Sequence, residues 1–473
     1  MKIMKNQLFI IVALFLFSIF LFGVNHFNNK VFAENKVEES VETQDKQSNK
    51  YNIEHIVLIT LESVRWDNLS YMGYIRETTP FLKNLANRSY VFENMITPIP
   101  MTAPSHASIL TSLYPNKTKF YINDSYLESN YKTLAEYLDE NNFQTLAFWG
   151  TRAMSESNFE QGFNVFGEVG KSLTVDELMN RENRRRMDTE TMELVFNELD
   201  KSSEENIFLM LHLDNPHRTK LEKVDDYIPT DDDPSDDLLL EHWKEKQHLS
   251  IGLTPRIDCF TEECFPMTES EKALAGMNRY DGAIQEADSH IRDLYEYFEK
   301  NDLNKNTLWL IIPDHGEGLG SHDFSGHSHY IYQEQIKTPL IMHMPGQTEG
   351  QRIPYLSENV DIFPTIIDIL GIKPEIDYSL EGVSLLRVLD EGPQKDYYFS
   401  MTSTFKQFSL LNENFKYIYI EEKIADGEKI IDTDMFFNIK QDPFELNNII
   451  NTAPEIENEF KNIILNKTIN SFY

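Results

Sequence analysis

The chain has 473 residues, of which 41% are apolar and 12% aromatic, so it can bury a large core. Its 77 acidic residues outnumber 43 basic ones, for a formal net charge of -34. This balance argues against nucleic acid or an anionic membrane surface as a partner, because both require basic patches. An anionic substrate would be repelled at long range, so its site would need a local positive centre such as a divalent cation.

The first patterned segment is the apolar run at residues 8–24, which follows Lys2 and Lys5. Positive charge ahead of such a run orients the N-terminus inward and the rest of the chain outward. Two interpretations stay open. Residues 1–33 are either a signal peptide cleaved after Ala33 or a retained anchor that associates the protein with a membrane. Both predict an exported protein that is periplasmic, extracellular or anchored facing outside.

The rest of the chain divides into segments that differ in composition and in the pattern of apolar residues. Residues 34–50 are polar and charged without periodicity, and we expect a disordered linker. Over residues 51–389 short apolar runs alternate with amphipathic stretches, which predicts an α/β layer fold. Residues 219–270 break this alternation with charge and proline, and are interpreted as an inserted loop or lid. Residues 390–473 hold short strand-like pieces and a final helix, which predicts a small antiparallel subdomain.

The chain has two cysteines, Cys259 and Cys264, close together within the inserted segment. In an oxidising compartment they are expected to form a local disulfide. A zinc site there would need two further ligands at a suitable spacing. The disulfide would staple a surface loop and take no part in the chemistry.

Three apolar runs of the kind found in buried parallel strands end at side chains that bind metals or anions. They are residues 55–61 before Glu62, residues 207–211 before His212 and His217, and residues 307–312 before Asp314 and His315. Ligands of such sheets collect beyond the carboxyl ends of the strands, so these side chains would meet along one edge. A metal-dependent hydrolytic site is the leading interpretation.

The segment that follows Asp314 is the densest in candidate ligands, because His315 is followed by His322, His327 and His329 around a glycine-rich turn. A carboxylate beside an imidazole at a strand end suits manganese, zinc or calcium. An isolated Asp-His pair would be better interpreted as a turn that satisfies its own backbone. The additional histidines favour a metal site.

Residues 101–111 contain a candidate nucleophile, Thr102. Pro104 suits the first turn of a helix, so Thr102 is expected just ahead of that helix. A helix N-terminus suits phosphate or sulfate, and a bound metal would activate the threonine hydroxyl for attack. The alternative that Thr102 only caps the helix stays equally open from this segment alone.

Together these segments resemble the sulfatase family of the alkaline phosphatase superfamily, from His55 to about residue 450. The matching pieces are TAPS at 102–105, LT at 110–111, YP at 114–115, PH at 216–217, DHGEGLG at 314–320 with His322, VDIFPT at 360–365, LEGVSL at 380–385 and DPFELNN at 442–448. The resemblance implies a catalytic domain over residues 51–389 with a central mixed, mostly parallel sheet flanked by helices. It also implies a small C-terminal antiparallel sheet with one helix.

The chain departs from the family at its nucleophile. Family sulfatases carry a Cys or Ser that matures to formylglycine, followed by an Arg, where this chain has Thr102 and His106. Threonine cannot yield the formylglycine aldehyde, so no formylglycine is expected. Lipoteichoic-acid synthases and phosphoethanolamine transferases use a metal-bound threonine instead. Their set is similar to Glu62, Thr102, Asp314 and His315.

The resemblance implies roles for the candidates. One divalent ion (manganese, calcium or zinc) would be held by Glu62, Thr102, Asp314 and His315. Thr102 would form a covalent intermediate, with His322 or His327 as the acid and base. Substrate would be contacted by His217, His106, His329 and Arg152.

Three functions follow from these roles. The leading one is an exported hydrolase of a phosphate or sulfuric ester on a small molecule, glycan or lipid headgroup. The threonine favours phosphate. A membrane-anchored phosphotransferase of the phosphoglycerol or phosphoethanolamine type is the first alternative, and a non-catalytic binding protein is the second.

Overall fold

The computed structural model describes most of the chain after residue 50. The described ranges are 51–123, 125–155, 157–167, 186–202, 206–218, 226–246, 268–324, 326–372, 378–422, 424–426 and 429–472. The expectations for segments 1–33 and 34–50 and for the Cys259–Cys264 disulfide lie outside these residues. Within the described part of the chain, no helix combines the length and apolar character that crossing a membrane requires.

The centre of the fold is an eight-stranded sheet in the order β4-β3-β5-β1-β6-β7-β2-β8. Its strands are β1 His55–Leu61, β2 Tyr90–Ile96, β3 Phe143–Trp149, β4 Val165–Gly167, β5 Asn206–Leu213, β6 Thr307–Pro313, β7 Leu340–His343 and β8 Gln351–Glu358. β7 alone runs antiparallel to its neighbours β6 and β2, and all other neighbours are parallel. The predicted mixed, mostly parallel sheet is confirmed.

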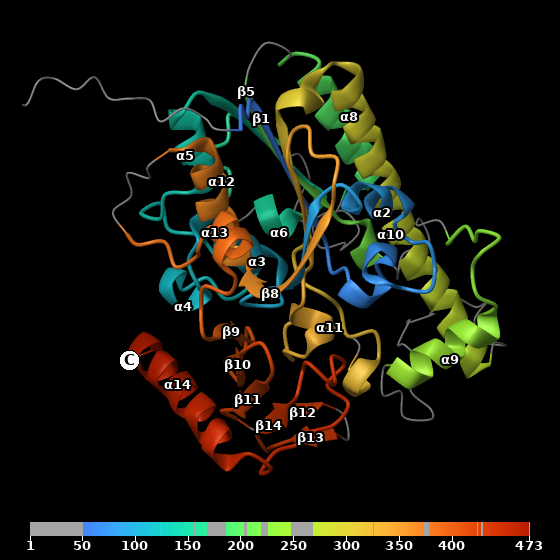
Figure 1. Cartoon of the computed structure of the whole chain (residues 1–473), viewed down its shortest axis with the longest axis vertical. Helices are drawn as coiled ribbons and strands as arrows, with labels where there is room; N and C mark the ends of the chain where they lie inside the picture. Colours follow the sequence, from blue (N-terminus) through green and yellow to red (C-terminus); the bar gives the residue numbers. More distant parts are fainter. Residues whose placement is uncertain are drawn as a thin grey trace, which may run out of the picture. The chain divides into compact units, whose positions relative to one another are not determined.

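Helices cover both faces of this sheet (Figure 1). One face packs on α3 Thr102–Thr111, α5 Leu134–Glu140, α12 Ile362–Leu370 and α13 Leu385–Glu391. The other packs on α2 Pro80–Ala86, α8 Asp188–Leu199 and α10 Glu269–Lys300. Side chains alternate along a strand, so Ile56 and Leu58 of β1 enter the first core and Val57 and Ile59 the second. Strands buried on both faces need continuous apolar runs, as β1 has.

The long helix α10 has clear sequence determinants. A capping box between Thr268 and Glu271 begins it, satisfying two backbone N–H groups. Its apolar side chains recur every three or four residues and are buried against the sheet, including Ile284, Ile291 and Phe298. This helix is one of the amphipathic stretches expected within residues 51–389.

A second, antiparallel sheet follows in the order β14-β11-β10-β9. Its strands are β9 Tyr398–Met401, β10 Gln407–Leu411, β11 Lys416–Ile420 and β14 Met435–Phe437, and α14 Pro454–Phe472 packs on it. This confirms the predicted small sheet with one helix. The hairpin of β12 Ile424–Asp426 and β13 Lys429–Ile431 was not predicted.

Shorter helices connect these parts. They are α4 Pro115–Thr118, α6 Arg152–Ser155, α9 Asp236–Lys246, α11 Gln333–Ile336 and the 3-10 turns η1 Trp66–Asn68, η2 Ser70–Met72, η4 Asn215–Arg218, η6 Leu303–Asn306, η7 Ser321–Asp323 and η8 Asn359–Asp361. The described part of the inserted segment is not all loop. α9 buries Leu239 and Trp243 against Tyr74 and Met277.

Candidate active site

Strand register brings the candidate ligands to one edge of the central sheet. Leu61, the last residue of β1, pairs with Leu213 of β5 and with Pro313 of β6. The residues that come next in the three strands are therefore level at the carboxyl edge. They are Glu62, Asp214 and Asp314.

Side-chain alternation then selects one face. Thr60 lies opposite His212 in the register and shares the face of Ile56 and Leu58, which α3 covers. The hydroxyl of Thr60 accordingly lies 2.8 Å from His106 Nε2 on α3. The strand ends and the start of α3 thus enclose one buried space.

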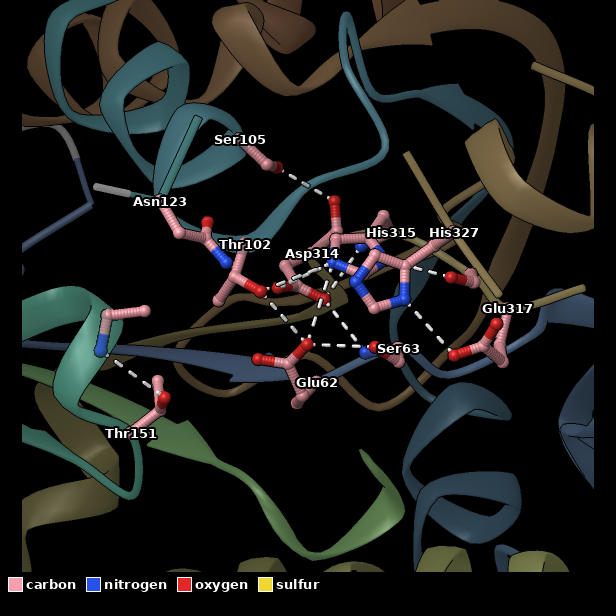
Figure 2. Close-up of polar contacts among 12 residues, drawn as sticks. Glu62, Ser63, Thr102, Ser105, Asn123, Thr151, Asp314, His315, Glu317 and His327 are labelled. Carbon is pink, nitrogen blue, oxygen red and sulfur yellow. Dashed lines mark hydrogen bonds and ion pairs between the residues drawn. The ribbon is translucent and has the colours of Figure 1, made fainter. Parts of the chain in front are cut away.

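Glu62, Thr102, Asp314 and His315 converge in that space (Figure 2). Both carboxylates and the imidazole are fully buried, and Thr102 is 3% exposed. Thr102 Oγ1 donates to Glu62 Oε1 at 3.0 Å and lies 3.5 Å from His315 Nε2. The structure therefore brings together the four residues to which the sequence assigned the metal.

Asp314 is held with one oxygen unsatisfied. Its Oδ1 accepts the backbone N–H groups of Ser63 at 3.0 Å and His315 at 2.7 Å. Ser63 reaches it from a left-handed conformation (φ 55°), a strain typical of functional sites. Oδ2 is buried and accepts no hydrogen bond from any described group. A buried carboxylate oxygen in this state fits a metal ligand.

The charges of the site also fit a cation. Burial and the neighbouring charge of Glu62 raise the pKa of Asp314 well above its ordinary value. Burial would likewise raise the pKa of Glu62, but a hydrogen bond with His212 and nearby imidazoles hold it well below that value. Two buried carboxylates this close cannot both ionise without positive charge between them. Two carboxylates with an imidazole and a hydroxyl suit a divalent ion such as manganese or zinc.

His315 has the orientation of a metal-binding imidazole. Its Nδ1–H donates to the carbonyl of Gly316 at 2.8 Å, so its Nε2 carries the lone pair. That Nε2 lies 3.5 Å from Glu62 Oε1 and 3.6 Å from Asp314 Oδ2. Burial lowers the pKa of His315 to about 4, which keeps the ring neutral.

Thr102 is the first residue of α3 and does not precede it, which corrects the expected boundary. No side chain caps the helix, and the hydroxyl of Thr102 is directed to Glu62, so the capping alternative is contradicted. The N-terminus of α3 has fewer free backbone N–H groups for binding an anion than the sequence predicted. The N–H of Ala103 already donates to Asn123 Oδ1, that of Ser105 to the Met101 carbonyl, and Pro104 has none.

His327 lies beside this cluster. Its Nδ1 is 3.1 Å from Glu317 Oε2, and its ring lies 4.5 Å from that of His315 and 5.4 Å from that of His217. Burial would lower the pKa of His327, but the carboxylate of Glu317 raises it. An imidazole with a raised pKa beside His315 can deliver a proton to a leaving group.

The other predicted histidines lie elsewhere. His322 uses Nδ1 with Glu334 at 2.8 Å and Nε2 with the carbonyl of Glu445 at 3.1 Å, and it stacks on Tyr332. Both of its nitrogens are occupied, so it fixes its loop and is unsuited to acid catalysis. His329 is exposed and packs near the ring of Phe324.

His106 differs from expectation, and the role predicted for Arg152 stays a prediction. His106 is fully buried behind Thr102, where its Nδ1–H donates to the Thr102 carbonyl at 2.7 Å. It therefore cannot reach a substrate. Burial lowers its pKa to about 3. Arg152 is half-buried at the start of α6, directly after β3.

Two residues at the site received no role from the sequence, which placed His212 only at a strand end and did not single out Arg65. His212 Nε2 lies 3.0 Å from Glu62 Oε2 with both side chains fully buried. Arg65 pairs with Asp67 and donates to the Gly318 carbonyl and to Ser321 Oγ, which ties the end of β1 to the loop after β6. His212 had a visible signal, the end of a buried strand. Arg65 had none, because the loop after β6 that it contacts is distant in sequence.

Comparison with known proteins gives a consistent result. The sulfatase family model matches residues 54–372, and the model of the N-sulphoglucosamine sulphohydrolase C-terminal region matches residues 320–469. The ulvan-active sulfatase of Formosa agariphila is 24% identical over 89% of this chain and 80% of its own length.

Solved structures agree on the fold. A complex with the substrate D-glucosamine-2-N,6-O-disulfate has a TM-score of 0.67 at 19% identity, covering 88% of this chain and 98% of the other. The phosphonate monoester hydrolase of Agrobacterium radiobacter has a TM-score of 0.66 at 18% identity, covering 88% and 96%. At these identities the likeness shows the fold alone.

Proposed function

Because this chain belongs to the sulfatase family, we propose that it is a metal-dependent ester hydrolase with Thr102 as its nucleophile. The observation that carries the proposal is the 3.0 Å hydrogen bond from Thr102 Oγ1 to Glu62 Oε1. The hydroxyl thereby lies inside a buried set of ligands that includes the unsatisfied Asp314 Oδ2.

Glu62, Asp314 and His315 would hold one divalent ion in contact with Thr102. When bound, such an ion lowers the pKa of a hydroxyl and offsets negative charge that develops on an ester. Thr102 Oγ1 attacks the phosphorus or sulfur while Glu62 Oε1 accepts its proton. The bond to the ester oxygen breaks, and His327 protonates that oxygen.

The second half of the proposed reaction hydrolyses the covalent intermediate and returns the protein to its starting state. His327, now neutral, accepts a proton from a water that attacks the phosphorus or sulfur of the group bound to Thr102. The bond to Thr102 Oγ1 breaks, and the proton held by Glu62 restores the hydroxyl. His217, whose ring lies 5.4 Å from that of His327, would contact the transferred group in this scheme.

A phosphate or phosphonate ester is the favoured substrate class. Sulfate transfer through a hydrated formylglycine needs a residue that threonine cannot provide, whereas a threonine ester of phosphate forms and hydrolyses by in-line displacement. The similarity to a phosphonate monoester hydrolase fold is compatible with this choice. The substrate would be a small molecule, glycan or lipid headgroup. The lysines before the apolar run at residues 8–24 support an exported protein.

The test measures hydrolysis of aryl phosphate, phosphonate, phosphodiester and sulfate esters by the wild type, Thr102→Ala and Thr102→Ser. Thr102→Ala should lose roughly 10³-fold or more in kcat, as nucleophile removal does elsewhere. Thr102→Ser keeps the hydroxyl and should retain turnover. Rapid quenching followed by mass spectrometry should find the transferred group on Thr102. Undiminished hydrolysis by Thr102→Ala would refute the assignment.

A further inference from the structure

We propose that His212 binds the cation of this site through Nε2, as a ligand beside Glu62, Asp314 and His315. This inference rests on the metal-dependent function proposed above. The sequence places His212 at a strand end, and the hydrogen bonding of the site gives it this role.

A chain of hydrogen bonds fixes which nitrogen of His212 carries the proton. The Thr102 carbonyl can only accept, so His106 Nδ1, 2.7 Å away, is the donor. His106 is fully buried and both of its nitrogens face neutral oxygens, so the ring is neutral and its Nε2 accepts. Thr60 donates its single hydroxyl proton to that Nε2 at 2.8 Å. His212 Nδ1, 2.9 Å from Thr60 Oγ1, must therefore be a donor to it.

A proton on Nδ1 leaves the Nε2 lone pair of a neutral His212 directed at Glu62 Oε2, 3.0 Å away. His315 has the same arrangement, with Nδ1–H anchored on the Gly316 carbonyl and Nε2 facing Glu62. Metal-binding histidines are oriented in this way, by a hydrogen bond from the other ring nitrogen. Two imidazoles thus present anchored lone pairs to the same carboxylate.

The separations between these atoms suit a shared ion. Atoms bound to one zinc-sized ion at about 2.0–2.1 Å lie roughly 3.0–3.5 Å apart. His212 Nε2 is 3.0 Å from Glu62 Oε2, and His315 Nε2 is 3.5 Å from Glu62 Oε1. Ligand atoms of Glu62, His212 and Asp214 lie within 4.8 Å of one another, as do those of Glu62, Asp314 and His315.

The competing explanation is that His212 is protonated and donates from Nε2 to Glu62; burial would lower the pKa of His212, but the Glu62 carboxylate raises it in the metal-free site. The two explanations differ in the size of one effect. Removing an outer partner of Glu62 should weaken metal binding by about 10–100-fold, and removing a ligand should weaken it further.

Calorimetric titration of the metal-free protein with Mn²⁺ and Zn²⁺ measures the size of this effect. His212→Phe should weaken binding by about 100-fold or more, since loss of an outer partner alone costs about 10–100-fold. Thr60→Val removes the acceptor that orients His212 and should weaken binding about 10–100-fold, which keeps the test available if His212→Phe does not fold. His343→Asn, a histidine change on β7, is the matched control and should bind as the wild type does. A loss of binding by His212→Phe that is no greater than that by Thr60→Val overturns the inference.

Cobalt substitution gives a second readout that is independent of activity. Exchangeable imidazole N–H protons of cobalt-bound histidines give strongly shifted proton NMR signals. Two such signals are expected in the wild type and one in His212→Phe. If the wild type binds no divalent ion, the proposed function fails together with the inference. If it binds the ion with a single shifted signal, only the inference fails.

Discussion

The imidazole of His327 carries the proton balance of the proposed reaction, because Glu317 holds it charged next to His315. His327→Gln should slow the first transfer step by about 10²–10³-fold for phenyl phosphate, the range expected for loss of a general acid. For 2,4-dinitrophenyl phosphate, whose leaving group needs no proton, the same step should be nearly unchanged. Rapid-mixing measurement of phenol release separates this step from the later hydrolysis. Equal losses with both esters would contradict the role of acid.

A different histidine should make the fold sensitive to acid. His343 at the end of β7 is 5% exposed, and its Nδ1–H donates to the Arg88 carbonyl at 3.0 Å. Burial lowers its pKa to about 4. As pH falls below about 6.5 the unfolded chain takes up this proton first, so the free energy of unfolding falls between about pH 6.5 and 4.

The loss attributable to His343 should reach about 3 kcal/mol, at roughly 1.4 kcal/mol for each pKa unit. His343→Asn keeps a donor toward Arg88 and cannot titrate, so its unfolding free energy should depend less steeply on pH over this interval. Urea denaturation of both proteins at several pH values measures the difference. Parallel curves would show that His343 does not contribute.

At the level of elements, the loop after β6 depends on backbone contact that glycine alone allows. A Cβ on Gly316 would lie 1.9 Å from the carbonyl oxygen of Glu334. Gly316→Ala should therefore displace His315, weaken metal binding and lower the free energy of unfolding by about 1–3 kcal/mol. Gly326→Ala is the matched control, because its Cβ meets only the ring of Phe324 at 3.2 Å. Calorimetric metal titration and thermal unfolding should separate the two variants clearly.

The elements themselves were largely predictable from the sequence. β1, β5 and β6 are continuous apolar runs, and a parallel sheet brings their carboxyl ends together. That reasoning found Glu62, Asp314 and His315. It could not place His106 or His322, because whether a histidine faces the substrate or a buried partner depends on side-chain packing. It also missed Arg65, whose role consists of contacts with residues more than two hundred positions away.

For the whole molecule, one buried ion pair links the small sheet to the catalytic loop. Lys416 Nζ on β11 lies 2.7 Å from Glu445 Oε1, and both side chains are fully buried. Glu445 Oε2 accepts the N–H of Gln333, and its carbonyl accepts from His322. The second sheet therefore fixes the segment that follows Asp314 and His315.

Lys416→Met should lower the free energy of unfolding by about 3–5 kcal/mol, because Glu445 is left buried without a partner. The double variant Lys416→Met/Glu445→Gln should regain at least half of that loss, since no uncompensated charge remains. Denaturant unfolding of the wild type, both single variants and the double variant completes the cycle. A double variant no more stable than Lys416→Met would show that the charge pairing itself is unimportant.

The level ends of β5, β1 and β6 have an evolutionary consequence. Glu62, Asp214 and Asp314 each follow a register-matched position on adjacent strands, so exchanging one donor for another leaves the backbone path intact. Proteins with this fold can therefore change the ion they prefer or the reaction they catalyse by single substitutions at these three positions. Descendants with different chemistry would then be nearly superimposable, which makes these positions more informative about activity than resemblance of the fold.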